Sequence, residues 1–426
     1  MTRPVKARPP RASDPYGVGP VGSWIAPALA VIGLVIVAVV TLNLLQGELP
    51  FGIGGNGGGG NGGNGSGNGA GADRTPAPSN VVVVPQEAKF KGSMVYAKAG
   101  NVWIQTDAGP RQLTDTGDDS MPSFSSDGQW VYYIHTVADK GKWPVKGQVE
   151  QYTPLDVPQL MRVRADGSGE PEMLASGKFT RGNYTYAYWI RQPVLSPDGS
   201  KIAVMSDAPN PDQSTVVLQL SDTATRKLSR VDVGVKGVLG HQDPEWRPDG
   251  QYLLYVRNGR DGSRGAPVIM RYNMAKGTVK EMTGPGYLQP SYSPDGKYIA
   301  ATKTSSRGSD VVILDGGNGR ELMRITNDSS SWSPVWSPAG DGIAFLHIDG
   351  QTVDLRLARL TGTAPSWTVE DTIDLTEVSG LDADSGPDWF IPADQLPPTP
   401  PPTVAPSTPV SSSSGASVAP SSSAAP

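Results

Sequence analysis

A strand–turn–strand phrase of alternating apolar and polar residues recurs five times in the middle of the chain. Each copy starts with a proline, continues to a large apolar residue two positions later, passes through a polar turn and ends in a segment with apolar residues at every second position. An apolar period of two is typical of a β-strand with one buried face. The copies begin at Pro122, Pro193, Pro244, Pro290 and Pro334.

The turn in the phrase reads S-P-D-G or a close variant, as in PVLSPDGSKIAVM at Pro193. This order fits a type I turn, because proline presets φ at the second position and aspartate and glycine suit the third and fourth. The large apolar residue before the turn is expected to pack one sheet on the next. Further strands are expected at 216–220, 268–272 and 311–314, and outer strands near 111–114, 226–229, 280–283 and 323–326.

The spacing of the copies indicates a propeller. The repeat prolines lie 71, 51, 46 and 44 residues apart, and a period of 40–50 with strand signals is typical of propeller blades. Residues 93–114 look like the last three strands of a blade, and 387–390 (PDWF) like a first strand alone. Joined, they make a sixth blade that closes the ring and removes exposed sheet edges. The sequence therefore predicts an all-β, six-bladed propeller of four-stranded blades.

The units P-x-[W/F/Y]-S-P-D-G followed by an apolar strand resemble the WD40-like (PD40) β-propeller repeats of TolB-type proteins. The resemblance covers about 300 residues, from Ser93 to about Phe390. It implies a six-bladed propeller over residues 86–396. TolB itself is periplasmic, has an additional N-terminal α/β domain and binds the Pal lipoprotein. Here an apolar run and a glycine-rich segment stand in place of that domain, so the resemblance does not carry the Pal partnership over.

The N-terminal region predicts a membrane anchor. Residues 24–46 carry no charge, and as a helix they would be roughly 34 Å long, enough to cross a bilayer core of about 30 Å. Four basic residues lie within 1–23, and the next basic residue after the run is Arg74. The positive-inside rule then places 1–23 in the cytoplasm and the propeller outside it. A cleaved signal peptide is the alternative, but its apolar region is usually shorter.

Two further segments are expected to be extended and solvated. Residues 47–85 form a linker whose central part, 52–72, is almost entirely Gly, Asn, Ser and Ala. Such glycine density keeps a chain flexible. Residues 397–426 contain nine prolines, nine serines and no charge, which is typical of a disordered tail. This tail is either a disordered terminus without a further role or a segment that carries sugars or enters a wall polymer.

Composition excludes several kinds of chemistry. The net charge is −5, which disfavours a nucleic-acid binder, and the absence of cysteine excludes thiolate sites. With three histidines and no G-x-S-x-G motif, we expect no cofactor, no metal and no α/β-hydrolase nucleophile. The turn aspartates are expected to serve the turns, at Asp127, Asp198, Asp249 and Asp295. The acidic segment DTGDDS (115–120) does not match an EF-hand loop and is expected to be a solvated connection.

A ring of polar residues is the first candidate binding site. Thirteen residues after each repeat proline, and at the equivalent place in the split blade, lie Lys98, His135, Ser206, Arg257, Lys303 and His347. Sixfold symmetry would bring these strand ends to one face. A basic ring would attract acidic peptides, carboxylated glycans or phosphate groups, and the two histidines would make the attraction depend on pH. The alternative is that these strand ends are exposed to solvent and therefore accept any polar residue.

The second candidate is an aromatic insertion in the second blade. The excess length of that blade lies in 136–158 and 176–192. It carries Trp143, Tyr184, Tyr186, Tyr188 and Trp189. Insertions in repeats usually map to loops on one face, often the binding face, and aromatic loops suit protein or glycan contacts. The alternative is that these side chains cover a gap beside the larger blade.

The sequence therefore predicts a membrane-anchored, extracytoplasmic propeller that acts as a scaffold of the cell envelope. Its expected partner is an envelope protein or polysaccharide, with no nucleic acid, and no catalytic residue is assigned. The alternatives are a glycan hydrolase or lyase acting at the central channel, and the sensory ectodomain of an envelope signalling system.

Overall fold

The chain divides into two units, Met1–Val83 and Val84–Pro426, and all described residues lie in the second. The computed structural model describes residues 89–143, 151–182, 184–209, 215–231, 233, 240–258, 267–376 and 379–397. It gives the backbone alone for 143 and 151–154. The predicted segments 1–23, 24–46 and 47–85, and the tail beyond Pro397, lie outside the described residues.

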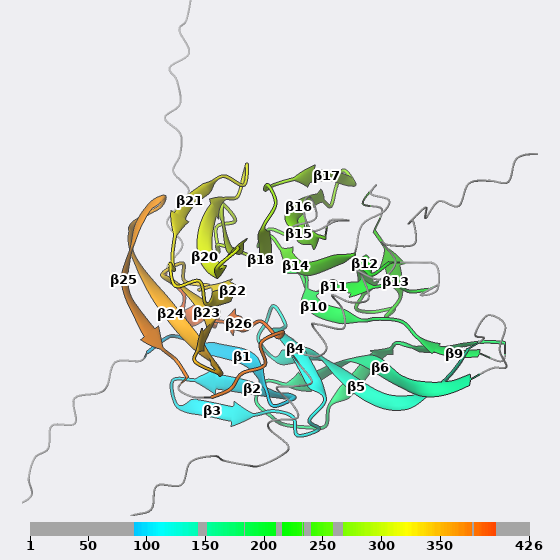
Figure 1. Ribbon diagram of the computed structural model, residues 1–426. Coiled ribbons are helices and arrows are strands. Elements are labelled where there is room, and N and C mark those ends of the chain that lie inside the picture. Colours follow the sequence, from blue (N-terminus) through cyan, green and yellow to red (C-terminus); the bar gives the residue numbers. More distant parts are fainter. Residues whose placement is uncertain are drawn as a thin grey trace, which may run out of the picture. The chain divides into compact units, whose positions relative to one another are not determined.

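The described residues form 26 strands and one short 3-10 helix, η1 (Ala393–Gln395). Six sheets follow one another along the chain (Figure 1). Blade 1 consists of β26 (Asp388–Phe390), β1 (Ser93–Lys98), β2 (Asn101–Thr106) and β3 (Gly109–Gln112). Blade 2 consists of β4 (Asp119–Phe124), β5 (Trp130–Trp143), β6 (Gln151–Arg164) and β7 (Glu172–Ser176), joined at the edge of β5 by β9 (Tyr184–Ala187) and β8 (Lys178–Arg181).

The remaining four blades have the same order from the inside outward. Blade 3 consists of β10 (Arg191–Leu195), β11 (Lys201–Ser206), β12 (Val217–Asp222) and β13 (Leu228–Arg230). Blade 4 consists of β14 (His241–Trp246), β15 (Tyr252–Arg257), β16 (Val268–Asn273) and β17 (Thr278–Glu281). Blade 5 consists of β18 (Tyr287–Tyr292), β19 (Tyr298–Ser305), β20 (Gly308–Asp315) and β21 (Glu321–Arg324). Blade 6 consists of β22 (Ser331–Trp336), β23 (Gly342–Asp349), β24 (Thr352–Thr363) and β25 (Ser366–Asp374).

The first strands of the blades form the inner circle. Each contacts the first strand of the next blade, in the order β4, β10, β14, β18, β22 and β26, and β26 contacts β4 again. The prediction of six blades is thereby confirmed, as are the strands expected from the repeated phrase.

The S-P-D-G turns have the predicted geometry. In each turn the glycine N–H donates to the carbonyl three residues earlier, as from Gly199 to Ser196 at 2.8 Å, and Gly199 has a φ of +70°. The serine hydroxyl donates to the aspartate, for example from Ser196 to Asp198 at 2.6 Å. This bond, with two more from Ser200, lowers the pKa of the Asp198 carboxyl to about 2. The expected turn role of these aspartates is confirmed.

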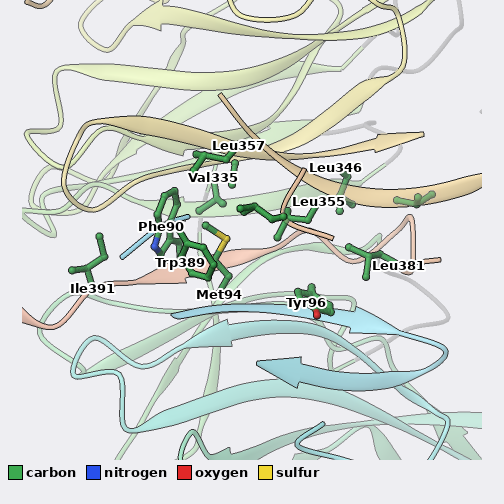
Figure 2. Packing of buried hydrophobic residues seen from close by; sticks show 13 residues of the cluster. Phe90, Met94, Tyr96, Val335, Leu346, Leu355, Leu357, Leu381, Trp389 and Ile391 are labelled. Atoms are coloured by element: carbon green, nitrogen blue, oxygen red, sulfur yellow. The ribbon is translucent and has the colours of Figure 1, made fainter. Parts of the chain in front are cut away.

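Closure of the ring combines hydrogen bonds with a dry core. Strand β1 pairs antiparallel with β26, with Met94 opposite Trp389. Trp389 is 6% exposed, contacts the edge of Phe90 with ring centroids 6.0 Å apart, and donates from Nε1 to the carbonyl of Lys91 at 2.8 Å. Figure 2 shows these side chains packed with residues of blade 6 such as Leu357. The C-terminal strand thus holds the N-terminal blade in place.

The expectation of a transmembrane helix is corrected. Within the part of the chain that the structure describes, no helix has the length and apolar character needed to cross a bilayer. The predicted span at 24–46 lies outside the described residues. The absence of charge shows that a segment leaves water readily. A membrane span also requires a continuous helical backbone, which the absence of charge does not establish. The single-pass localisation, cytoplasmic N-terminus included, is withdrawn with it.

Candidate functional site at the centre of the propeller

A β-bulge interrupts the inner strand of each of blades 2 to 6, just before the repeat proline. There the register shifts, as between Gln242 and Glu245 on β14, so that the inner strand has one residue more than its partner. The residue before the proline takes a positive φ in all five blades: Met121 (55°), Gln192 (51°), Asp243 (54°), Gln289 (51°) and Ser333 (48°). All five residues line a cavity at the centre of the ring.

Side chains at the bulges link blades 3, 4, 5 and 6 in sequence. The Asp243 N–H donates to Gln192 Oε1 at 2.9 Å, and Gln192 Nε2 donates back to Asp243 Oδ1 at 2.7 Å. The Gln289 N–H donates to Asp243 Oδ2 at 3.0 Å. The Ser333 N–H in turn donates to Gln289 Oε1 at 3.0 Å. The backbone N–H groups that the bulges leave without a strand partner therefore find acceptors on polar side chains of the neighbouring blade.

A second tier of such links lies three residues further along three of the inner strands, β4, β18 and β22. The N–H of the large apolar residue donates to a side chain of a neighbouring blade: Phe124 to Asp388 Oδ2 at 2.7 Å, Tyr292 to Glu245 Oε1 at 3.0 Å, and Trp336 to Ser291 Oγ at 3.0 Å. Two carboxyl groups, Glu245 and Asp388, are thereby fixed between blades and face the cavity.

The cavity has a volume of about 470 Å³. Its walls are mixed: prolines of the inner strands and of the turns, with Val194, Trp336 and Trp389, supply the apolar part, and polar atoms line almost as much of the surface. Its described lining includes four carboxylic acids, Asp243, Glu245, Asp384 and Asp388, and no Lys, Arg or His. A concave site with apolar walls and a few converging polar groups is the usual form of a binding pocket.

Burial changes the acidity of these carboxyls. Burial raises the pKa of Glu245 to about 8, against the opposing effect of the Tyr292 N–H and with help from the negative charge of Asp388. Burial also raises the pKa of Asp243 to about 6, although bonds from Gln289 and Gln192 and the charge of Arg191 act in the other direction. The pKa of Asp388 is raised by burial as well. A positive charge brought into the cavity would favour the ionised form of each group.

Three residues of the predicted polar ring, Lys98, Ser206 and Arg257, end their second strands, whereas His135, Lys303 and His347 lie inside longer ones. His135, Arg257, Lys303 and His347 each pair with the first residue of the inner strand. Lys303 pairs in register with Tyr287, and His347 with Ser331. They therefore lie away from the S-P-D-G turns, at the other end of the inner strands. Whether the ring binds anything stays a prediction, but its charges have partners inside their own blades.

Each charged residue of the ring contacts a local partner. Arg257 bonds Glu281 at 2.8 Å, Lys303 bonds Glu321 at 2.6 Å, and His135 Nδ1 bonds Asp119 at 2.7 Å. Lys98 Nζ lies 5.4 Å from the ring centre of Trp103. Ser206 is buried and accepts the Ala208 N–H at 3.1 Å. These partners neutralise part of the charge that the ring residues carry.

His347 belongs to a cluster that superficially resembles a catalytic triad. Ser331 Oγ lies 3.0 Å from His347 Nδ1 and 2.9 Å from Asp328 Oδ2. In a triad the carboxylate holds the imidazole nitrogen that faces away from the serine, whereas here both groups contact Nδ1, with Asp328 at 3.3 Å. Ser331 is 0% exposed, so a substrate cannot reach it. The cluster ties the start of β22 to the end of β23.

The insertion of blade 2 forms strands where loops were expected. Residues 136–143 and 151–158 lengthen β5 and β6, which pair along their whole lengths. The β8–β9 hairpin adds to β5 at Lys142 and Thr185, and this extension reaches beyond the other sheets (Figure 1). The expectation of loops was wrong because backbone pairing continued through the insertion.

The aromatic residues of the insertion partly pack on one another. Phe179 stacks on Tyr186 with ring centres 5.4 Å apart and contacts Tyr188 at 5.6 Å, while Tyr184 lies 6.1 Å from Tyr186. Trp189 is 54% exposed, with the guanidinium of Arg191 5.8 Å from its ring centre. The side chain of Trp143 lies outside the described residues. A binding role for these residues stays a prediction.

The acidic connection 115–120 does not assemble a metal site. Asp119 turns inward to His135, and the carbonyl of Asp118 accepts the Thr136 N–H at 2.9 Å. Across the described ranges no group of three or more His, Cys, Asp or Glu side chains is arranged to hold a metal ion.

Residues 174–370 match the family model of the TolB beta propeller domain (PD40). The repeats are of the TolB type. The recognition made from the repeated phrase is thereby confirmed.

Relatives of the TolB-type propeller are found among curated proteins. The chain is 32% identical over 240 residues to the Tol-Pal system protein TolB of Francisella tularensis subsp. tularensis (strain WY96-3418), an alignment that covers 53% of this chain and 45% of that protein. The chain thus spans about half the length of that relative. The uncharacterized protein Atu1656 of Agrobacterium fabrum is 28% identical over 201 residues, covering 46% of this chain and 61% of that protein.

Two solved structures are similar at low identity. TolB from Acinetobacter baumannii is 21% identical, with a TM-score of 0.46 over 70% of this chain and 66% of that one. An oligogalacturonate lyase from Vibrio parahaemolyticus is 14% identical, with a TM-score of 0.40 over 61% of this chain and 83% of that one. Because both scores are below 0.5, the fold assignment rests on the sheet order and on the matching repeats.

Proposed function

We propose that this TolB-type propeller is a protein-binding scaffold of the cell envelope, which receives a short basic segment of a partner in its central cavity. The observation that carries the proposal is the cavity lining, in which partly apolar walls surround four carboxylic acids with no described basic residue among them. Sequence similarity to a Tol-Pal system protein supports an envelope setting and a protein partner.

The carboxyls suit a cationic guest because two of them are held in place before it arrives. Asp388 accepts the N–H groups of Phe124 and of Trp389, and Glu245 accepts that of Tyr292. Their positions therefore need little reorganisation, which lowers the entropic cost of binding. An ammonium or guanidinium group would supply a positive charge to these half-buried carboxyls.

The test is a binding comparison with peptides that differ at one position. Three decapeptide libraries, with Lys, Gln or Glu fixed at the centre, are titrated by fluorescence anisotropy against the full chain and against Glu245→Gln. This variant would keep an oxygen for the Tyr292 N–H but could not ionise. Glu170→Gln, an exposed site outside the cavity, is the matched control.

At pH 8 the Lys library should bind at least tenfold more tightly than the Glu library, and Glu245→Gln should weaken that preference. Affinity for the Lys library should rise between pH 6 and pH 8, because a cation binds best once Glu245 is ionised. Equal binding of the three libraries, or an unchanged preference in Glu245→Gln, would contradict the proposal.

The alternative of an enzyme at the channel is favoured by no specific observation. Asp243, Glu245 and Asp388 lie in the cavity, but each accepts main-chain N–H bonds that join blades. Those bonds explain why the carboxyls are present, since they join neighbouring blades. The same bonds hold the carboxyls in position for the binding role proposed here.

A further inference from the structure

The C-terminal end of the described chain lies at the mouth of the central cavity. After β26, Ile391 packs into the same cluster as Trp389, and η1 turns the chain so that Leu396 lines the cavity. Leu396 also packs against that buried cluster. The turn prolines Pro294 and Pro338 line the cavity too, so the chain ends on the side of the S-P-D-G turns.

Residues 398–426 continue from this position. The first thirteen, PTPPPTVAPSTPV, contain six prolines and two valines, and the whole segment carries no charge. A segment that starts beside a site is present there at an effective concentration on the order of 1 mM. Proximity alone therefore makes even weak binding of this segment significant.

The chemistry of the cavity fits a proline-rich guest. Asp243, Glu245 and Asp388 each already accept a main-chain N–H group. Their remaining lone pairs can receive a single cationic group but not an N–H from every residue of an extended peptide. Proline has no N–H to lose, and proline-rich segments are commonly bound by apolar, aromatic-lined grooves. Trp336 and Trp389 and the repeat prolines provide such walls.

We propose that residues 398–410 of this chain occupy the central cavity intramolecularly and compete there with the partner. The inference deepens the proposed function and rests on it, because both assign the cavity to a peptide. An uncharged segment gains nothing from the ionised carboxyls, so a basic partner segment displaces it. Unrelated uncharged peptides lack the charge needed to displace the C-terminal segment, so they are excluded from the cavity.

The test uses a labelled peptide with the sequence of 398–410 and three forms of the protein. These are the full chain, a chain ending at Pro397, and a full-length chain in which 398–426 is replaced by Gly and Ser. All three keep every described residue. The peptide should bind the shortened and the Gly/Ser forms equally, and the full chain about tenfold more weakly, since the covalent segment competes.

A cavity variant locates the site. Val194→Trp fills the cavity from β10 and should abolish peptide binding to the shortened chain. Val279→Trp, at a half-buried valine on the outer strand β17, is the matched control and should bind normally. Should Val194→Trp fail to fold, the comparison of the three tails still decides the question.

Equal affinity for all three tail forms, no binding to any of them, or binding that survives a folded Val194→Trp would overturn the inference. The Lys-centred decapeptide library separates this failure from that of the proposed function. If that library binds the shortened chain and the 398–410 peptide does not, the cavity is a peptide site and only the intramolecular occupant is refuted.

Discussion

Glu245 should destabilise the folded propeller at alkaline pH, and removing its charge should reverse the effect. Its pKa rises from 4.5 to about 8 on folding, chiefly through burial. Below pH 4.5 the carboxyl is neutral in both states and has no effect. Between pH 4.5 and 8 the folded state keeps a proton that the unfolded state loses, so stability falls as pH rises.

The full difference between 4.5 and about 8 corresponds to about 5 kcal/mol. Because the cavity admits water, which screens the charge, we expect about 2 kcal/mol at pH 8. Glu245→Gln should therefore increase the free energy of unfolding by that amount at pH 8 and leave it nearly unchanged at pH 4.5.

Urea unfolding of both proteins at the two pH values, followed by circular dichroism, measures the effect. Glu170→Gln serves as the control, and we expect no difference at either pH because that side chain is exposed. A loss of stability in Glu245→Gln at pH 8, or the same change at both pH values, would refute the assignment of a half-buried carboxyl that stays neutral below pH 8.

Three further predictions concern the closure of the propeller, the strand ends and the turns. Trp389→Ala should cost about 3–5 kcal/mol of unfolding free energy in denaturant titrations, since it removes a buried indole at the closure. Lys303→Ala should cost less than about 1 kcal/mol, because its pair with Glu321 is partly exposed, and should leave the affinity for Lys-centred peptides unchanged. Gly250→Ala should cost about 1–2 kcal/mol, because its φ is +69° although no atom would clash with the new Cβ; a neutral effect on melting would contradict this.

The fold could be predicted from local rules that repeat. A proline, a large apolar residue and an S-P-D-G turn specify two strands and their connection wherever they occur, and the split phrase at 93–114 and 387–390 leaves one arrangement that pairs every strand. Turn chemistry and period-two alternation depend on only a few neighbouring residues, so they can be predicted from the sequence. The match extends to the closing pair of Met94 and Trp389.

The central site could not be predicted because no residue type marks it. The bulge positions hold Met121, Gln192, Asp243, Gln289 and Ser333, five side chains with no shared chemistry. Their common property is a backbone angle, which depends on the register between strands. The local partners of the predicted basic ring could not be read from the sequence for a related reason: spacing places Lys303 near a strand end but does not show that Glu321, on another strand, contacts it.

The position at which a basic peptide contacts the protein tests the central claim most directly. The Lys-centred decapeptide library, carrying a photoreactive group, is cross-linked to the full chain and to the chain ending at Pro397, and the attachment sites are mapped by mass spectrometry. The account predicts attachment to the cavity walls, at 192–194, 243–248, 289–294 and 334–338, and more of it in the shortened chain. Attachment confined to the strand ends around Lys98 and Arg257, or to the β8–β9 hairpin, would contradict it.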